Sequence, residues 1–537
     1  MKDVALFLGL VATVLAIVYF SGPGLGIHPS TNLIVFMAAA VLIFCIFIFT
    51  IPRNKFKTGI SHGSAAWANS HDVSEMLTMT DTKLAQGALM LCPSPWSRSQ
   101  RLDIPHHLTL RHTVIIGPSG SGKGRGFFLW NCANFCGSFI TSDPKSEAWT
   151  LTSGFHQKAI RFAPRDPNNS QAFNWIPLCG KDTLLCLLLA RAVMTADEDE
   201  GAKADGFWVK AESALLAAVF AHASTFTAPT PAAAYDFLTS KPGELLVDEL
   251  LNSPNRTARE FASIFSQTDP RLRGSMIIAV VTSIIWLSDK LVRRFTSSTV
   301  IPPDIGQIRN ESIAMYWCLS ENDVAVLKPL TSIFFTLALL QLKESTGAVP
   351  TNLFLDEFAN IGRIPNFSTE IAILRGRGIA ITAGLQNIEQ LEDNYGRAKA
   401  RVILGNFNSK IVLAGLDYES AEYISRSLGE VTLEESRTSS TFRGGLLRTI
   451  GSRTTSVSKH ARRLLTADEI RRIGEREQVT ITTNRKPIYS KRFWYTAAPN
   501  PARHEPLGKA LTVPFRNSKS SEATSRVSEP PPIPEGL

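Results

Sequence analysis

A glycine-rich turn between a predicted strand and a predicted helix constrains the fold of this chain more than any other feature. The apolar, β-branched segment His112–Ile116 predicts a buried strand, and the next residues, Gly117–Gly124, read GPSGSGKG. The spacing G-x-x-x-x-G-K is typical of a loop whose consecutive backbone N–H groups surround a phosphate. An amphipathic helix is expected next, with its positive end toward that phosphate. Its apolar residues are Phe127, Phe128, Trp130, Cys132 and Phe135.

The loop predicts a binding site for ATP. The residues expected to bind the nucleotide are Gly117, Pro118, Ser119, Gly120, Ser121, Gly122, Lys123, Gly124 and Arg125. Lys123 would reach the β- and γ-phosphates. One position departs from the usual motif, because Gly124 stands where a Ser or Thr ordinarily holds Mg²⁺. A glycine-rich turn without a ligand is the alternative for this segment taken alone.

A pair of carboxylates strengthens the prediction. The segment Thr351–Phe358 reads TNLFLDEF, an apolar strand that ends in Asp356 and Glu357. Two carboxylates at the end of a buried strand are costly unless they have a role, although a solvated turn is the alternative. In a phosphate-binding-loop fold Asp356 would bind Mg²⁺, and Glu357 would orient and deprotonate the attacking water. We expect the loop and this pair to meet across adjacent strand tips and to hold one ATP with its Mg²⁺.

A third polar position follows the next predicted strand. The segment Gly378–Leu385 reads GIAITAGL, and it ends at Gln386. Gln386 could sense the γ-phosphate, or it could be a surface amide that caps the next helix. Upstream, Arg375 and Arg377 flank a glycine, and one of them could act as an arginine finger on a neighbour's nucleotide. A phosphate-binding or solvated role for these arginines is equally open.

The remaining apolar segments predict an α/β core around a mostly parallel sheet. Four more strands are expected, at Ser138–Ser142, Ala159–Ala163, Ser312–Cys318 and Lys410–Ala414. From Gly180 to Phe295 the periodicity is helical, which predicts an all-helical insert. Within the insert, Phe207–Ala223 predicts a helix with one apolar face that is formed by Leu215, Leu216, Val219 and Phe220.

Two apolar runs at the N-terminus, Val4–Phe20 and Leu33–Ile51, are each long enough to span a bilayer. Lys2 precedes the first run, and three basic residues follow the second, so both ends are expected in the cytoplasm. The segment 1–57 is therefore predicted to be a two-helix membrane anchor, with a cleaved signal peptide as the alternative. A mean hydropathy of +0.03 is too low for a polytopic transporter and too high for a disordered chain.

Charge and cysteine usage narrow the range of partners. The net charge of +9 allows nucleic acid or anionic lipid as a partner without requiring either. Arg437–Arg463 holds seven basic residues and no acidic one. This segment predicts a solvated flexible loop, with a contact for DNA phosphate or anionic lipid as the alternative. The seven cysteines are scattered without a CxxC pair, which indicates reduced core thiols rather than a disulfide framework.

Taken together, these motifs resemble the type IV coupling proteins, the TraG-like membrane ATPases of conjugation and type IV secretion. The resemblance covers roughly residues 1–500 and includes the lysine–glycine form of the loop. Beyond the loop, the sequence segments that carry the resemblance are TSDPKSEAW at Thr141–Trp149, FNWIPL at Phe173–Leu178, FLDEFANIGRIP at Phe354–Pro365, GIAITAGLQNIEQLEDNYG at Gly378–Gly396, NFNSKIVLAGLD at Asn406–Asp417 and LLTADEI at Leu464–Ile470.

The resemblance implies a RecA-like P-loop ATPase core with an inserted all-α domain, assembled as a hexamer on the bacterial inner membrane. The core would comprise residues 58–179 and 301–496, the insert 180–300, and a disordered, Pro/Ser-rich tail 497–537. Such a protein receives relaxase-bound single-stranded DNA, or proteins, and passes them to the secretion channel by using ATP. Three alternatives stay open: export of effector proteins only, a double-strand translocase of the chromosome-segregation type, and a non-hydrolysing nucleotide-binding membrane adaptor, which Gly124 favours.

Overall fold

The computed structural model describes residues 63–196, 206–298, 304–443 and 449–493. The predicted anchor at 1–57 and the predicted tail at 497–537 lie outside these residues. Among the described residues, no helix is long and apolar enough to cross a bilayer. Residues 65–431 form one compact unit with the segment that starts at Arg462, and residues 432–461 belong to a second unit. We call the first unit the body.

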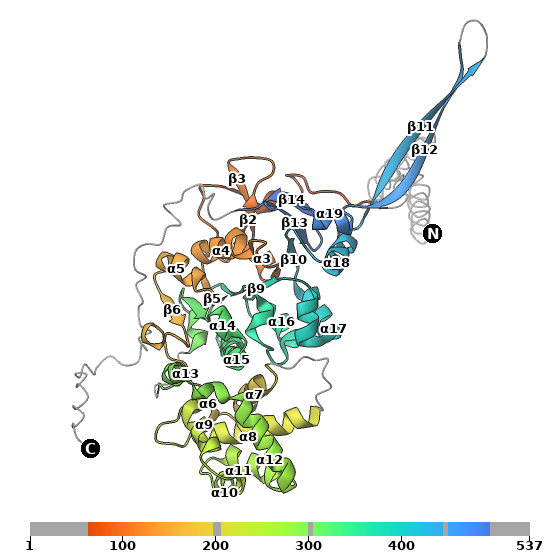
Figure 1. Cartoon of the computed structure of the whole chain (residues 1–537). Coiled ribbons are helices and arrows are strands. Elements are labelled where there is room, and N and C mark those ends of the chain that lie inside the picture. Colours follow the sequence, from red (N-terminus) through yellow and green to blue (C-terminus); the bar gives the residue numbers. More distant parts are fainter. Residues whose placement is uncertain (1–62, 197–205, 299–303, 444–448, 494–537) are drawn as a thin grey trace, which may run out of the picture. The chain divides into compact units, whose positions relative to one another are not determined.

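A nine-stranded sheet lies at the centre of the body, with the strand order β14-β13-β10-β4-β9-β8-β5-β7-β6 (Figure 1). The strands from β10 to β6 pair in parallel, whereas β13 and β14 are added antiparallel at one edge. The bounds are β4 Thr113–Ile116, β5 Ser138–Asp143, β6 Ala159–Phe162, β7 Ala314–Cys318, β8 Thr351–Leu355, β9 Ile379–Leu385, β10 Ser409–Val412, β13 Glu477–Thr482 and β14 Ile488–Lys491. The predicted α/β class and mostly parallel sheet are confirmed.

The central strands are apolar along their whole length because helices cover both faces of the sheet. Every residue of β4, β8 and β9 is buried. Parallel strands that are covered on both sides have continuous apolar sequences, which is why the sequence indicated them. The antiparallel pair β13 and β14 was not predicted, and neither was a separate three-stranded sheet with the order β1-β3-β2. The strands of that sheet are β1 Leu77–Met79, β2 Leu89–Pro93 and β3 Gln100–Ile104.

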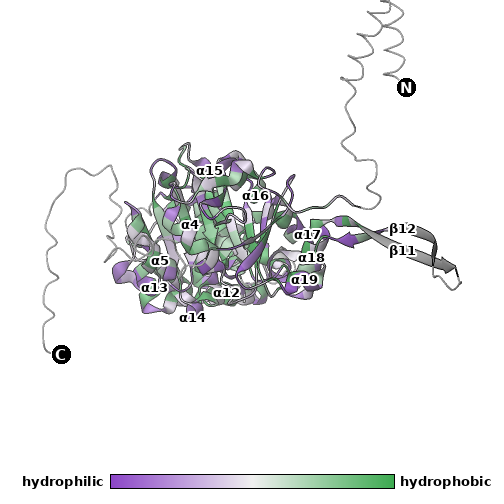
Figure 2. Ribbon diagram, turned by 90° about the horizontal axis from the view of Figure 1, so that it is seen from above, coloured by the Kyte–Doolittle hydropathy of each residue, from purple (hydrophilic) through white to green (hydrophobic). Residues whose placement is uncertain are grey.

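The helices of the body outside the insert belong to the layers around the two sheets. They are α3 His106–Thr109, α4 Leu129–Asn134, α5 Glu147–Thr152, α14 Glu321–Val324, α15 Lys328–Glu344, α16 Phe367–Gly376, α17 Glu389–Asn406, α18 Tyr418–Leu428 and α19 Ala467–Arg471. Figure 2 shows hydrophobic residues inside the body and hydrophilic residues around them. The main apolar core is therefore shared between the sheet and its helices.

A block of helices separates β6 from β7, and between these strands the described residues contain no further strand. Its members are α6 Ile176–Cys179, α7 Thr183–Met194, α8 Gly206–Ala223, α9 Pro231–Thr239, α10 Gly243–Leu251, α11 Arg256–Ser266, α12 Pro270–Ser283 and α13 Lys290–Phe295. The prediction of one apolar face on α8 is wrong, because Leu215–Ala221 are buried without a break. The helices α7, α9, α10, α11 and α12 all pack against α8, so it is a central helix with no solvent face along that stretch.

The helix after the glycine-rich turn also differs from its predicted amphipathic form. The chain leaves the turn through a wide π-type segment, Gly124–Phe128, and continues as α4. The apolar side chains of this region are buried on every side; they are Phe127, Phe128, Leu129, Trp130, Cys132 and Phe135. Within the same helix Asn131 is buried, and it is satisfied by hydrogen bonds with Met90 N–H, Met90 O and Phe127 O.

The prediction of a flexible loop at Arg437–Arg463 is also wrong. The strands β11 Glu430–Arg443 and β12 Thr449–Arg463 form a two-stranded sheet, which Figure 1 shows as a long ribbon. Threonine and valine favour extended backbone, and paired strands satisfy each other's backbone groups without an apolar face that hydropathy would reveal. At the base of this hairpin, within the body, Leu464 N–H donates to Gly429 O at 3.0 Å.

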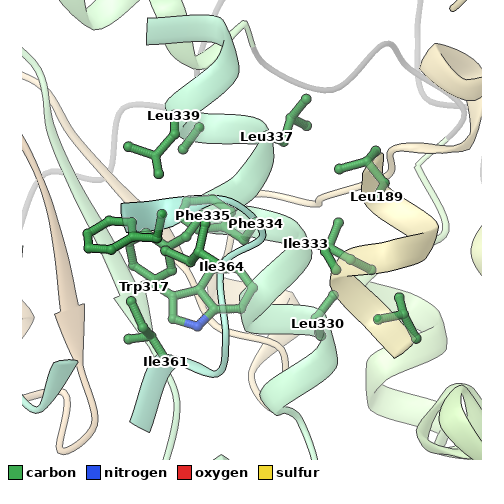
Figure 3. Packing of buried hydrophobic residues seen from close by; sticks show 14 of the residues in the cluster. Leu189, Trp317, Leu330, Ile333, Phe334, Phe335, Leu337, Leu339, Ile361 and Ile364 are labelled. Carbon is green, nitrogen blue, oxygen red and sulfur yellow. The ribbon is translucent and has the colours of Figure 1, made fainter. Parts of the chain in front are cut away.

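A long buried helix, α15, joins the sheet to the helical block. Trp317 on β7 stacks on Phe334 of α15, with ring centroids 4.3 Å apart. Figure 3 shows this packing, with Leu189 of α7 on the other side of α15 beside Ile333. Side chains from the sheet, α15 and α7 therefore belong to one core.

Candidate active site

The ends of several parallel strands open into one cavity of about 420 Å³. Because the carboxyl ends of parallel strands meet at one edge, residues after β4, β5 and β8 are brought together there. The charged and glycine residues that line the cavity are Gly120, Gly122, Lys123, Gly124, Arg125, Asp143, Lys145, Glu147, Asp356 and Glu357. The predicted loop and the predicted carboxylate pair thus line a single cavity.

The strand tips that carry these two groups are not adjacent, which corrects the expectation from the sequence. The strand β9 lies between β4 and β8 and pairs with both. The groups meet across β9 because Gly384, near its end, has no side chain. A Cβ atom at Gly384 would stand 3.1 Å from Asp356 Oδ1 and 3.2 Å from Phe128 Cε2. Gly384 was not among the residues that the sequence singled out, and its signal was a glycine within an otherwise buried apolar strand.

The glycines of the turn adopt the conformation that a phosphate-binding loop requires. Gly120 and Gly122 have φ angles of 76° and 83°, which residues with a side chain rarely adopt. Lys123 is buried, and its ammonium group donates to Gly117 O at 2.7 Å and to Pro118 O at 3.2 Å. Burial lowers the pKa of Lys123, while Asp356 and Glu357 act in the opposite direction. The ammonium group therefore lies folded against the loop in this structure.

Asp356 has the environment of a cation ligand. Among the described residues, no donor lies within hydrogen-bond distance of its buried Oδ1 atom. Burial raises the pKa of Asp356 to about 7; nearby Lys123 lowers it, and Glu357 and Asp143 raise it further. An unpaired carboxylate oxygen next to a phosphate-binding loop fits Mg²⁺, a hard cation that prefers oxygen ligands and shares them with phosphates and water. Within the described ranges, no group of three His, Cys, Asp or Glu residues forms a metal cluster.

The conformation of Glu357 directs it into the cavity. Its φ angle of 62° is left-handed, an uncommon conformation for a residue with a side chain. The Glu357 carboxylate accepts a hydrogen bond from Asn360 Nδ2 at 2.6 Å. This arrangement fixes a carboxylate that lines the cavity beside Asp356. Asn360 is a positioning residue that had no distinct signal in the sequence.

Gly124 leaves room beside the carboxylate of Asp356. A Cβ atom at this position would lie 3.4 Å from Asp356 Oδ2, which is ordinary contact distance. A serine or threonine hydroxyl would therefore stand directly against the carboxylate. With glycine, Asp356 faces the loop without an intervening side chain.

Two predicted catalytic residues, Gln386 and Arg375, do not line the cavity, and neither do Gly117, Pro118 and Ser121 of the loop. Gln386 directly follows β9, and its N–H group bonds to Gln390 Oε1 at 3.3 Å. Its neighbour Leu385 accepts a hydrogen bond from Gly117 N–H at 3.0 Å, so Gln386 lies beside the loop. Arg375 is exposed near the end of α16, just before β9 begins, and therefore lies at the opposite edge of the sheet. Within one chain it does not reach the cavity.

One wall of the cavity is formed by the segment at the end of β5 and directly after it, to which the sequence analysis assigned no role. Asp143 is buried, and its carboxylate accepts Trp149 N–H at 2.8 Å at the start of α5. Burial raises the pKa of Asp143, and the backbone N–H groups of α5 oppose this shift. Ser142 Oγ donates to Asp356 O at 2.9 Å and so ties this wall to the end of β8. Lys145 completes the wall.

The fold and this cavity define an α/β protein of the phosphate-binding-loop class. The chain matches, over residues 66–526, the profile of the family described as "Type IV secretory system Conjugative DNA transfer". The chain belongs to this family, and the resemblance that its motifs indicated is confirmed.

Curated relatives agree with this assignment. The chain is 24% identical to Protein VirD4 of Rhizobium radiobacter over 462 residues, which are 81% of this chain and 64% of that protein. It is 26% identical to Conjugal transfer protein TraG of Escherichia coli over 460 residues, which are 77% of this chain and 71% of that protein. The chain therefore spans less than two thirds of the length of this VirD4.

Solved structures show the same fold. The unbound bacterial conjugative coupling protein TrwBdeltaN70 superposes with a TM-score of 0.62 at 17% identity, over 82% of this chain and 96% of that one. The plasmid coupling protein TrwB in complex with ADP and Mg²⁺ gives a TM-score of 0.59 at 17% identity, over 80% and 94%. This chain thus has a TrwB-like α/β nucleotide-binding fold with a mixed, mostly parallel sheet.

Proposed function

We propose that this protein is an ATP-dependent coupling protein that transfers relaxase-bound single-stranded DNA into a type IV secretion channel. The observation that carries the proposal is the single cavity that is lined both by Lys123 of a glycine-rich loop and by Asp356, whose Oδ1 atom has no hydrogen-bond donor among the described residues. Membership of the conjugative DNA transfer family supplies the process that this site would drive. The ADP and Mg²⁺ in the TrwB complex agree with a nucleotide site in this fold.

The residues of this chain would share the chemistry as follows. The loop N–H groups and Lys123 hold the β- and γ-phosphates of ATP, and Asp356 holds Mg²⁺. The metal, when bound, neutralises charge on the phosphates. Glu357, fixed by Asn360, accepts a proton from the attacking water, and Gln386 reports the γ-phosphate from the end of β9. Because phosphoryl transfer needs little covalent help, placement and charge neutralisation account for most of the catalysis.

The same proposal extends to assembly and location. The core would be RecA-like and would form a homohexamer, in which Arg375 reaches the nucleotide of a neighbouring copy. Residues 1–57 would anchor the ring in the bacterial inner membrane by two passes, in contact with lipid and with the channel components of that membrane. The position of Arg375 at the edge of the sheet opposite its own cavity is consistent with a role in a neighbour.

The test is ATP turnover by the purified full chain, measured with and without single-stranded DNA. We expect turnover that DNA stimulates, loss of nucleotide binding in Lys123→Ala, and normal binding with turnover reduced about 100-fold or more in Glu357→Gln. Both variants should also lose conjugative transfer in cells. Lys158→Ala is the matched control, because Lys158 is an exposed lysine that precedes β6 at the opposite edge of the sheet.

Normal turnover or transfer by Lys123→Ala or Glu357→Gln would refute the assignment of the site. Nucleotide binding without any turnover by the wild type would instead favour the non-hydrolysing adaptor, the alternative that Gly124 keeps open. Turnover that responds to a secreted protein and not to DNA would favour a coupling ATPase for effector proteins.

A further inference from the structure

Three cations line the cavity, and they differ in what holds them. Lys123 donates to carbonyl groups of its own loop. Arg125 lies 3.8 Å from Glu147, which itself lines the cavity. Lys145 pairs at 3.1 Å with Glu321, which does not line the cavity. Of these three, Lys145 therefore has a counter-ion outside the space that a ligand would occupy.

The backbone that carries Lys145 is firmly placed. On one side Asp143 accepts the N–H group of Trp149, and Pro144 follows it. On the other side Ser146 has a left-handed φ of 51° at the start of α5. The side chain of Lys145 itself is 60% exposed, so its ammonium group can change partner without a movement of this backbone. The ion pair with Glu321 raises the pKa of Lys145, so the ammonium group keeps its charge at neutral pH.

The counter-ion Glu321 stands on a different element. It begins α14, which follows β7 and leads into α15. Trp317 of β7 stacks on Phe334 of α15, and α7 packs on α15 (Figure 3), so the elements on either side of α14 belong to the core that the helical block shares. The ion pair thus connects the wall of the cavity with the helices beyond β7.

An exposed ion pair such as Lys145–Glu321 contributes little to stability, because water screens it and two long side chains must be ordered. A charged hydrogen bond to a phosphate in a partly enclosed cavity is stronger. A terminal phosphate in the cavity would therefore compete successfully with Glu321 for Lys145. A diphosphate lacks that phosphate and would leave the ion pair intact.

We propose that Lys145 is the residue that distinguishes a nucleoside triphosphate from a diphosphate in this cavity, by exchanging Glu321 for the terminal phosphate. The inference rests on the proposed nucleotide site and adds a specificity residue to it. The exchange would release Glu321, and with it the start of α14, only when a triphosphate is bound. In this way α14 and α15, which follow β7, and the helical block whose α7 packs on α15 would respond to the state of the nucleotide.

The experiment measures, by calorimetry on the purified full chain, the affinities for ADP and for the non-hydrolysable analogue AMP-PNP, each with Mg²⁺. We expect Lys145→Met to weaken AMP-PNP binding by about tenfold while it changes ADP binding by less than about twofold. Glu321→Gln removes the competitor and should strengthen AMP-PNP binding by about two- to fivefold, again without a change for ADP.

Lys158→Met is the matched control. Lys158 forms an ion pair of similar exposure with Glu311, and these two residues lie before β6 and β7 begin, at the edge of the sheet opposite the cavity. Neither affinity should change in this variant. Hydrogen exchange at 321–327 should rise in the wild type with AMP-PNP and stay constant with ADP.

Equal weakening of both ligands by Lys145→Met, or no effect on either, would overturn the inference while the nucleotide site stands. Weaker AMP-PNP binding by Glu321→Gln would overturn the proposed exchange of partners at Lys145, because it would show that Glu321 helps to bind the nucleotide. A wild type that binds neither nucleotide would refute the proposed function and this inference together.

Discussion

Lowering the pH is expected to destabilise this fold through one buried histidine. His112 directly precedes β4, and its ring is buried. Its Nε2 atom donates to Ile371 O at 2.8 Å, and its Nδ1 atom accepts the N–H group of Ile381 at 3.0 Å. A neutral ring satisfies both contacts, whereas a protonated ring would turn Nδ1 into a donor that faces another donor. The ring thereby joins β4 to α16 and β9.

Burial lowers the pKa of His112 from 6.5 to about 4, although the contact with Ile371 opposes the shift. The unfolded chain therefore binds a proton at a higher pH than the folded chain does. The stability that the neutral ring contributes is fully present above pH 6.5 and is lost as the pH falls toward 4. The linkage relation gives a loss of about 2 kcal/mol at pH 5 and about 3 kcal/mol near pH 4.

The assay is urea unfolding of the purified chain at a series of pH values, with His112→Gln as the variant. Glutamine offers one donor and one acceptor but does not titrate, so the variant should lose about 2 kcal/mol less than the wild type between pH 7 and pH 5. His107→Gln, which removes an exposed histidine, is the control and should keep the wild-type slope. Parallel pH profiles for the wild type and His112→Gln would refute the reasoning.

Three further predictions concern single residues around the site. Asn131→Leu should cost about 3 kcal/mol in thermal or urea unfolding, because it leaves Met90 N–H and O unpaired in the core; an unchanged midpoint would contradict this. Gly384→Ala should weaken Mg²⁺-dependent nucleotide binding by roughly threefold or more, since its Cβ would crowd Asp356 Oδ1, whereas Gly405→Ala, which meets open space, should leave binding unchanged. Because the pKa of Asp356 is about 7 and metal binding requires its ionised form, Mg²⁺-dependent affinity should fall about tenfold from pH 8 to pH 6, and Asp356→Asn should abolish this dependence.

The sequence predicted the elements of the site better than their arrangement. The strands β4, β8 and β9 have continuous apolar sequences, and each ends in residues whose chemistry is distinctive. Their order in the sheet depends on crossover connections, and a single sequence does not reveal which strand lies between two others. The interposition of β9, and with it the role of Gly384, therefore became visible only in the structure.

Polar contacts between residues that are far apart in the sequence were the second kind of feature that could not be predicted. Lys145 and Glu321 are far apart in the chain and become partners only because β5 and β7 are neighbours. The hairpin of β11 and β12 escaped prediction for a different reason: its many threonines, serines and arginines produce no apolar alternation. Hydropathy detects strands by the face that they bury, and this argument is weak for a ribbon of two strands.

The base of this hairpin has a practical consequence. Gly429 and Leu464 are already hydrogen-bonded to each other within the body, so the chain enters and leaves the ribbon at one point. A short glycine-containing turn could join these two positions and remove all that lies between them without stretching the remaining backbone. Such a shortened protein would keep the cavity and lack the cationic ribbon, so the contribution of the ribbon to the proposed function could be measured by comparison with the full chain.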